Sequence, residues 1–353
     1  MDARQKSLRI GIAALLCGMI FRFFSPGMLD PVLRFLSKPQ TVAFLIYAET
    51  GHRVRLSPAG EVLPEQIDDG DLCFAWESPP PALPDWVYPT FSDPASVSVD
   101  YGCSYRPDIE MLLQQPLSWN LRGNQPTVLI YHTHTTESYQ RLGADYEETA
   151  PYRTLDNHYN IVAIGDRITE MLEQAGICVL HDRQVHDYPS FNTAYVHSRN
   201  AAKELLKKHP GIQLVLDLHR DAIEGPEGQM KTTANLGGST SAQLMIVVGT
   251  NSRVPHSKWP RNLSLGLKLQ AQLQQQTPGI VRPLQLTPQR FNQDLSPGAL
   301  LIEVGAAGNS HREALLAGEE LARAIIALSR GTGPTADWEE TAADPPAAPE
   351  AGF

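Results

Sequence analysis

From residue 126 onward, short apolar runs alternate with segments whose apolar residues recur at helical spacing. Apolar runs of roughly four to eight residues are typical of buried strands. The runs are 127–131, 177–180, 212–218, 243–248 and 299–304. The helical segments are 160–175, 193–208, 263–276 and 312–330. Strands separated by helices in this rhythm predict an α/β domain with a mixed, largely parallel sheet flanked by helices.

The sequence on either side of this pattern differs in composition. In residues 1–25, basic residues precede an apolar run from Ile10 to Ile20, which predicts a transmembrane or signal anchor. Residues 26–125 are rich in proline and predict a small, irregular extracytoplasmic β-region with short strands. We expect the main domain over 126–330 and a disordered acidic tail over 331–353. Together these boundaries predict a single-pass protein of the cell membrane whose main domain lies outside the cytoplasm.

The charge and the absent motifs exclude several classes of protein. The chain carries 29 Lys and Arg against 39 Asp and Glu, for a formal net charge of −10. Nucleic-acid binding relies on clustered Lys and Arg, so we expect no nucleic-acid partner. The sequence contains neither a G-x-x-x-x-G-K-[ST] phosphate loop nor a G-x-S-x-G nucleophile elbow. The sequence therefore gives no support for a P-loop nucleotidase or for a serine hydrolase with a nucleophile elbow.

Three polar clusters follow or interrupt the apolar runs. The segment His132–Glu137 comes directly after the first run, Asp217–Asp221 ends the third, and Glu303 lies inside the last. A carboxylate within a buried strand is unfavourable unless it is paired, metal-bound or catalytic. Ligands bind at the carboxyl ends of the strands in sheets of this type. We therefore expect the three clusters to form one site.

The residue types in these clusters are those that a zinc hydrolase needs. Such enzymes use two or three His or carboxylate ligands, an open position for water, and a carboxylate that takes the proton from that water. His134 and Glu137, three residues apart after a strand, supply two ligands, and His219 supplies the third from another strand. Glu303 is then the general base, and Zn²⁺ is the expected cofactor.

Three assignments within this site stay open. His132 and His134 point the same way in an extended segment, so one binds the metal and the other hydrogen-bonds the substrate. The His-x-x-Glu spacing favours His134 as the ligand. Asp156 is a rival third ligand. Arg220 either contacts a substrate carboxylate or oxyanion, or orients Glu303.

Five longer segments carry a resemblance to a known family. They are TVLIYHTHTTESY (127–139), RTLDNHYNIVAIGD (153–166), SFNTAYVHSRN (190–200), LDLHRDA (216–222) and FNQDLSPGALLIEVG (291–305). In this order they resemble the stage II sporulation protein P family, and the resemblance covers residues 126 to 325. By motif, His132 or His134, together with His219, match the metal histidines of the family, and Glu303 matches its catalytic glutamate.

The resemblance implies a function beyond what the spacing shows. It implies a membrane-anchored, zinc-dependent peptidoglycan hydrolase with the fold of N-acetylmuramoyl-L-alanine amidases. The bond cleaved is the amide between N-acetylmuramic acid and the L-alanine of the stem peptide, and endopeptidase activity is also attributed to the family. The implied setting is engulfment of the forespore during sporulation, with stage II sporulation proteins D and M as partners. A zinc carboxypeptidase that trims stem peptides and a non-catalytic wall-binding scaffold are the alternatives.

Overall fold

A computed structural model of the protein describes residues 87–143, 145–226 and 228–333. The strands of its main sheet are Val99–Tyr101 (β1), Val128–Tyr131 (β2), Val179–His181 (β3), Leu214–Asp221 (β4), Leu244–Gly249 (β9), Leu284–Thr287 (β10) and Ala299–Ala306 (β11). The α-helices are Ile109–Gln114 (α4), Ile161–Gln174 (α5), Ala194–Lys208 (α6), Trp259–Gln276 (α7) and His311–Leu328 (α8). Two hairpins lie outside the sheet, Glu224–Gly225 (β5) with Gly228–Gln229 (β6) and Thr233–Leu236 (β7) with Ser239–Ala242 (β8).

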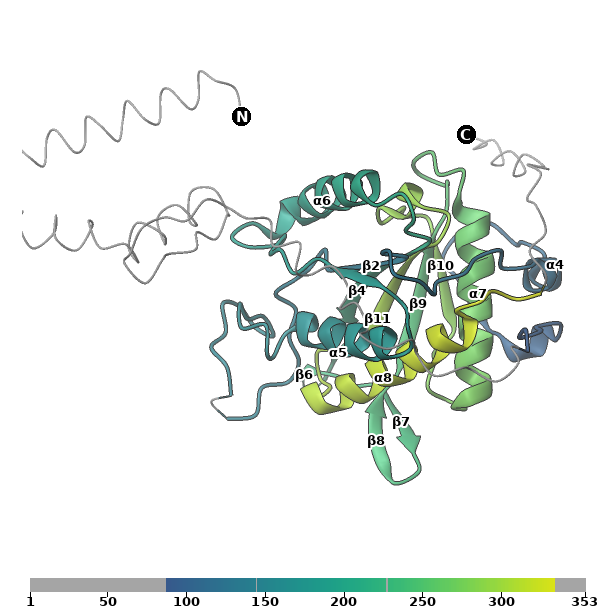
Figure 1. The fold of residues 1–353 in the computed structure, drawn as a ribbon. Helices are drawn as coiled ribbons and strands as arrows, with labels where there is room; N and C mark the ends of the chain where they lie inside the picture. The colour runs from purple at the N-terminus through teal and green to yellow at the C-terminus, as the bar shows by residue number, and fades with distance from the viewer. Residues whose placement is uncertain (1–86, 144, 227, 334–353) are drawn as a thin grey trace, which may run out of the picture. The chain divides into compact units, whose positions relative to one another are not determined.

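The main sheet is mixed and largely parallel, as the sequence predicts. Its strand order is β1-β10-β9-β11-β4-β2-β3, and Figure 1 labels the strands from β10 to β2. Each neighbouring pair is parallel except β9–β11. The flanking helices are also those that the periodicity predicts, although α7 begins a turn earlier than expected.

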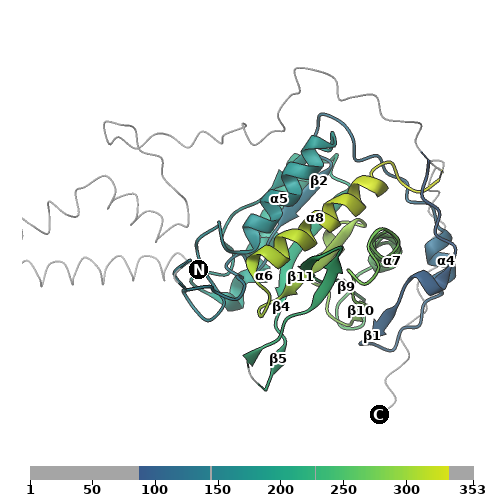
Figure 2. The same cartoon turned by 90° about the horizontal axis from the view of Figure 1, so that it is seen from below.

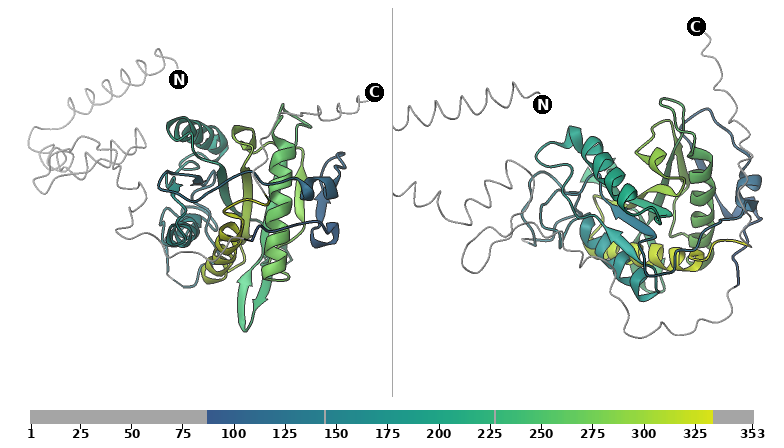
Figure 3. Two further views of the ribbon diagram at one scale, coloured as in Figure 1. Left: turned by 45° about the vertical axis from the view of Figure 1, so that its right-hand side comes forward. Right: turned by 45° about the horizontal axis from the view of Figure 1, so that its top comes forward.

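The two faces of the sheet carry different layers of helices. The α5, α7 and α8 helices cover one face and α6 lies on the other (Figures 1 and 2). The turned views show the same arrangement (Figure 3). Because side chains alternate along a strand, residues such as Ile130 and Leu216 enter the large core under α5, α7 and α8. Leu129 and Val215 point to the opposite face and pack with α6.

The α5 helix shows how local sequence sets the layer beneath the candidate site. Asn160 caps its first turn by accepting a hydrogen bond from the Val162 N–H at 2.9 Å. Ile161, Ile164, Ile168 and Leu172, at three- and four-residue spacing, are buried, and Gly176, with φ of 76°, follows the end of the helix. A Cβ at Gly318 of α8 would lie 2.8 Å from Ile164, so the two helices approach closely there because residue 318 is glycine.

Residues 87–125 are part of this folded unit. The short β1 strand pairs in parallel with β10, and the large core includes Leu112, Trp119 and Leu121. The Trp119 indole N–H also donates to the Leu328 carbonyl at 2.7 Å. The sequence places these residues in a Pro-rich region ahead of the domain, because β1 and α4 are too short to give a periodic signal. The structure places them in the domain itself.

Within the part of the chain that the structure describes, no helix combines the length and the apolar character that a bilayer crossing needs. The prediction of a single-pass membrane protein with an extracytoplasmic domain is corrected on this finding. The anchor predicted over 1–25, the first part of the region 26–125 and the tail from residue 334 lie outside the described residues.

A buried lysine joins α7 to the end of α4. Lys268 is 1% exposed, and its Nζ donates to the Leu112 carbonyl at 2.7 Å and to Ser264 Oγ at 2.8 Å. Burial lowers the pKa of Lys268 to about 7, from an ordinary value of 10.5.

Replacing Lys268 by methionine is expected to change how stability depends on pH. Between about pH 7 and pH 9 the unfolded chain holds a proton at this site that the folded chain releases, so the wild type becomes more stable as pH rises. The wild type therefore gains about 2 kcal/mol relative to Lys268→Met over this range. Urea unfolding of both proteins at the two pH values measures the change, and a constant difference would contradict it.

Candidate active site

The pairing of β11 with β4 places two predicted site residues side by side. The two strands run parallel, with Glu303 opposite His219 and Leu301 opposite Asp217. These four side chains lie on the face of the sheet that α6 covers. Val215 of β4 and Ala299 of β11 pack on that face, and residues two and four positions further along a strand point the same way. Neighbouring strands are about 4.8 Å apart, so the His219 and Glu303 side chains lie next to each other.

The loop that follows β2 brings the other two predicted residues to the same place. A cavity of about 330 Å³ is lined by His134, Glu137, His219 and Glu303. The loop turns back on itself after Tyr131, with the Glu137 N–H donating to the His134 carbonyl at 3.1 Å. Side chains from one loop and two strands therefore meet in a single cavity.

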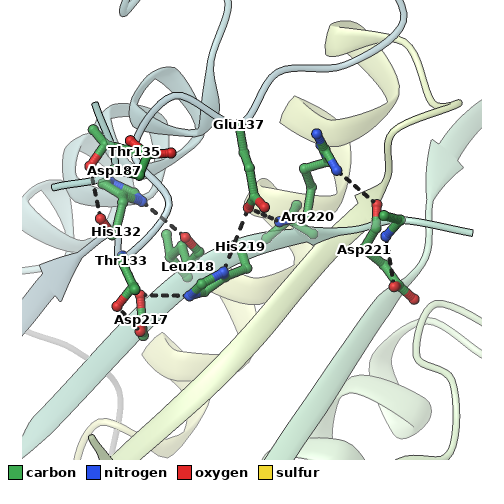
Figure 4. A network of polar contacts seen from close by, with 12 residues as sticks. His132, Thr133, Thr135, Glu137, Asp187, Asp217, Leu218, His219, Arg220 and Asp221 are labelled. Carbon is green, nitrogen blue, oxygen red and sulfur yellow. Dashed lines mark hydrogen bonds and ion pairs between the residues drawn. The ribbon is translucent and has the colours of Figure 1, made fainter. Parts of the chain in front are cut away.

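His219 contacts two carboxylates and one imidazole. Its Nδ1 lies 3.6 Å from Glu137 Oε2, and its Nε2 lies 3.0 Å from Asp217 Oδ1 (Figure 4). The His134 ring meets the His219 ring edge to face, with centroids 5.2 Å apart. The backbone N–H of Arg220 donates to Glu137 Oε2 at 3.1 Å and so fixes this carboxylate beside His219.

Three polar atoms of cavity-lining residues are buried without a hydrogen-bond partner: His134 Nδ1, His219 Nε2 and Glu303 Oε2. Two imidazoles and a carboxylate are ligands that zinc prefers, and a further carboxylate beside them suits a base. The donor types, with the unpartnered nitrogen of His134, therefore fit a zinc ion. In the ranges 87–143, 145–226 and 228–333, no three His, Cys, Asp or Glu side chains are arranged as a ready-made metal site.

The charges in the cavity shift the ionisation of its residues in opposite directions. Burial raises the pKa of Glu303 to about 8, with the carboxylates of Glu137 and Asp221 acting in the same direction. Burial also acts to raise the pKa of Glu137, but the close contact with His219 and the charge of Arg220 outweigh it and hold that pKa well below its usual value. One carboxylate is thus stabilised in its charged form and the other in its neutral form.

His132 does not share the cavity with His134. It is fully buried, its Nδ1 lies 3.2 Å from the Leu218 carbonyl, and its Nε2 lies 2.8 Å from Nε2 of His181. The expectation that both histidines face the same way is not met, because the chain turns after Tyr131 rather than staying extended. The rival ligand Asp156 bonds to His158 and is not among the cavity residues.

Arg220 lines the cavity, but its guanidinium holds the protein backbone. Its Nε donates to the Ser138 carbonyl at 2.8 Å, and its Nη2 donates to the Tyr152 carbonyl at 2.9 Å. The sequence predicts that Arg220 contacts substrate or orients Glu303. The structure shows Arg220 joining β4 to the segments that contain Ser138 and Tyr152, and a role toward substrate or Glu303 stays a prediction.

The structure adds cavity residues that the sequence analysis did not single out: Arg153, Phe191, Tyr195 and Phe291. The half-exposed Phe191 ring stacks on His134 with centroids 4.2 Å apart, and the Arg153 guanidinium lies over the same Phe191 ring at 4.7 Å. Arg153 also pairs with Asp187 at 2.7 Å and with Glu137 at 3.4 Å. These contacts make an aromatic and cationic wall opposite the strands.

The backbone at one edge of the cavity is in an uncommon conformation. Phe291 and Asn292 are consecutive non-glycine residues with φ of 48° and 60°. Such left-handed residues persist where surrounding contacts hold them, and they cluster at functional sites. Here the Asn292 side chain donates to the Tyr195 carbonyl and to Ser198 Oγ, both at 3.2 Å. The pair is a structural signal that sequence spacing does not reveal.

The fold and the cavity define an α/β protein with a histidine and carboxylate site on one face of a mixed sheet. The family Stage II sporulation protein P (SpoIIP) matches residues 92–326, and the chain belongs to this family. Stage II sporulation protein P of Bacillus subtilis (strain 168) is 28% identical over 202 residues, which cover 54% of this chain and 48% of that protein. The chain thus spans about half the length of this relative.

Solved structures of amidases resemble the chain more remotely. N-acetylmuramoyl-L-alanine amidase AmiC2 of Nostoc punctiforme is 15% identical, with a TM-score of 0.36, covering 58% of this chain and 97% of that one. The CwlD amidase from Clostridioides difficile, in complex with the GerS lipoprotein, is 15% identical with a TM-score of 0.35 over the same shares. Similarity at this level carries no inference about activity.

Removing the Arg220 guanidinium is expected to destabilise the protein. Arg220→Met leaves the buried Ser138 carbonyl and the partly buried Tyr152 carbonyl without their charged donor, which predicts a loss of about 3 kcal/mol of unfolding free energy. Arg323→Met is the matched control, because Arg323 is half-exposed and its ion pairs among the described residues are with Glu319 and Glu320 of its own helix. That variant is expected to lose less than about 0.5 kcal/mol. Equal losses in urea unfolding would contradict the role assigned to Arg220.

Proposed function

We propose that this chain is a zinc-dependent peptidoglycan hydrolase that cleaves the amide between N-acetylmuramic acid and the L-alanine of the stem peptide. The observation that carries the proposal is the meeting of His134, His219, Glu137 and Glu303 in one cavity. The resemblance to the stage II sporulation protein P family supports peptidoglycan as the substrate. That activity would make the chain an N-acetylmuramoyl-L-alanine amidase.

Three of the four residues are the proposed zinc ligands. His134 offers an Nδ1 with no other partner, and His219 and Glu137 already face each other across 3.6 Å. When bound there, zinc polarises the scissile carbonyl and lowers the pKa of water toward neutrality. Glu303 stays outside this set, one strand away from His219.

Glu303 is the proposed general base and acid. Its carboxylate takes a proton from the attacking water and later gives it to the leaving amine of L-alanine. A catalytic group works best when its pKa lies near the working pH, and burial raises the pKa of Glu303 to about 8. The β11 strand holds the side chain in place through ladders on both sides, with β4 and with β9.

The charges of the cavity wall favour a substrate that is cleaved at an internal amide over one that is cleaved next to a free terminal carboxylate. A carboxypeptidase needs a cation that is free to bind the terminal carboxylate. The two arginines that line this cavity are engaged, Arg153 with Asp187 and Glu137, and Arg220 with backbone carbonyls. This pairing supports an amidase, with or without endopeptidase activity, over a carboxypeptidase.

The biological setting is also part of the proposal. The resemblance to the family supports action in engulfment of the forespore, together with stage II sporulation proteins D and M. Co-purification of the full chain with each partner tests the association, and recovery of neither would contradict this part.

Glu303→Gln is expected to reduce digestion of purified sacculi by about 10²- to 10⁴-fold, because the amide cannot accept the proton of the attacking water. Zinc content should not change, since Glu303 is not a proposed ligand. Glu110→Gln, an exposed change on α4, is the control and should retain full activity. Dye release from labelled sacculi and elemental analysis measure the two quantities. Normal digestion by Glu303→Gln would overturn the role of this residue.

Chelation of the full chain is expected to stop sacculus digestion, and added zinc to restore it. Mass spectrometry of the soluble products identifies the bond. Free lactyl groups on muramic acid and new L-alanine amino ends are the expected products. Released terminal amino acids would instead indicate a carboxypeptidase, and zinc-free protein without digestion would indicate a binding scaffold.

A further inference from the structure

A buried aspartate behind the cavity has no part in the mechanism above. Asp217 is 1% exposed and lies on β4 two residues before His219, on the same face of the strand. It does not line the cavity. A carboxylate in such a place is unfavourable unless donors surround it, so its contacts indicate what it is for.

The donors to Asp217 come from the loop that carries His134 and Glu137. The Thr133 backbone N–H donates to Oδ1 at 2.8 Å, and the Thr133 hydroxyl donates to Oδ2 at 2.6 Å (Figure 4). The Thr133 hydroxyl also lies 2.8 Å from Ser198 Oγ of α6. Asp217 therefore ties the first residues of the loop to β4.

The same carboxylate contacts His219 from behind. Asp217 Oδ1 lies 3.0 Å from Nε2, on the side of the ring opposite Nδ1, which faces Glu137. The contact is close, although its geometry is not that of a standard hydrogen bond. An imidazole whose Nε2 proton points at a carboxylate keeps Nδ1 for a ligand on the other side.

We propose that Asp217 is a positioning residue that sets both halves of the site. It fixes the loop with His134 and Glu137 through Thr133, and it holds His219 with its Nε2 proton inward and its Nδ1 toward the cavity. This inference rests on the proposed function, because it assumes that Nδ1 of His219 is a zinc ligand. Two other contacts join the same segments: the one from His132 to the Leu218 carbonyl involves none of the proposed ligands, and the one from the Arg220 N–H holds Glu137 but does not touch His134 or the His219 ring.

The direct test is the state of the His219 ring in the metal-free full chain. Nitrogen-15 NMR of the histidine side chains is expected to show a slowly exchanging proton on Nε2 of His219. A bare Nε2, with the proton on Nδ1 alone, would overturn the proposal. This measurement needs no variant and no zinc, so it stays decisive even if the proposed enzymatic activity fails.

The second test is zinc affinity, measured by competition with a chromogenic chelator. Asp217→Asn is expected to weaken zinc binding by about 10- to 100-fold, since a neutral amide oxygen holds the His219 ring less strongly than a carboxylate does. Asp182→Asn is the matched control, because Asp182 is also a buried aspartate beside a histidine, His186, but neither of them lines the cavity. It should lower stability while changing zinc affinity by less than about threefold. If both variants lose only stability, Asp217 is structural and the proposal is wrong.

Discussion

The parallel pairing of β4 with β11 is the constraint on which the candidate site depends. This ladder puts His219 opposite Glu303, and the alternation of side chains places both on the face of the sheet that α6 covers only in part. A shift of one residue in this register would turn Glu303 into the core beneath α5 and α8. The site is therefore as rigid as the centre of the sheet, and only the loop after β2 has to be held separately.

That loop is held by polar contacts rather than by packing. Thr133 donates to Asp217, and Arg220 donates to the carbonyl of Ser138 at the other end. The acceptor Asp217 and the donor Arg220 both lie on β4, on either side of His219. One strand thus supplies a proposed ligand and also the two anchors that bring the other ligands to it.

Much of the architecture follows from sequence because apolar runs and helical periodicity are local signals. The five strands with clear apolar runs and the four long helices are where the pattern predicts them. The β1 and β10 strands were missed, since each has three or four residues and is stabilised mainly by pairing within the sheet. The change in composition predicts a domain boundary at position 126. The structure shows no boundary there, because residues on both sides pack into one hydrophobic core, and composition does not reveal tertiary packing.

The site was predictable where a residue conflicted with its surroundings. Glu303 is identified because a carboxylate interrupts an apolar strand, and the same reasoning applies to Asp217, for which the sequence alone indicates no role. Separating His132 from His134 required the turn after β2, which depends on distant partners such as Leu218 and His181. Phe191 and Arg153 reach the cavity from segments with no periodic signal, so only the folded structure places them there.

The most direct test of the account is the position of zinc in crystals of the metal-loaded protein, located by anomalous diffraction at the zinc absorption edge. The account predicts one strong peak bonded to Nδ1 of His134, Nδ1 of His219 and the carboxylate of Glu137, with Glu303 beside it and unbound. A peak on other residues, or zinc-loaded crystals with no peak in this cavity, would contradict it.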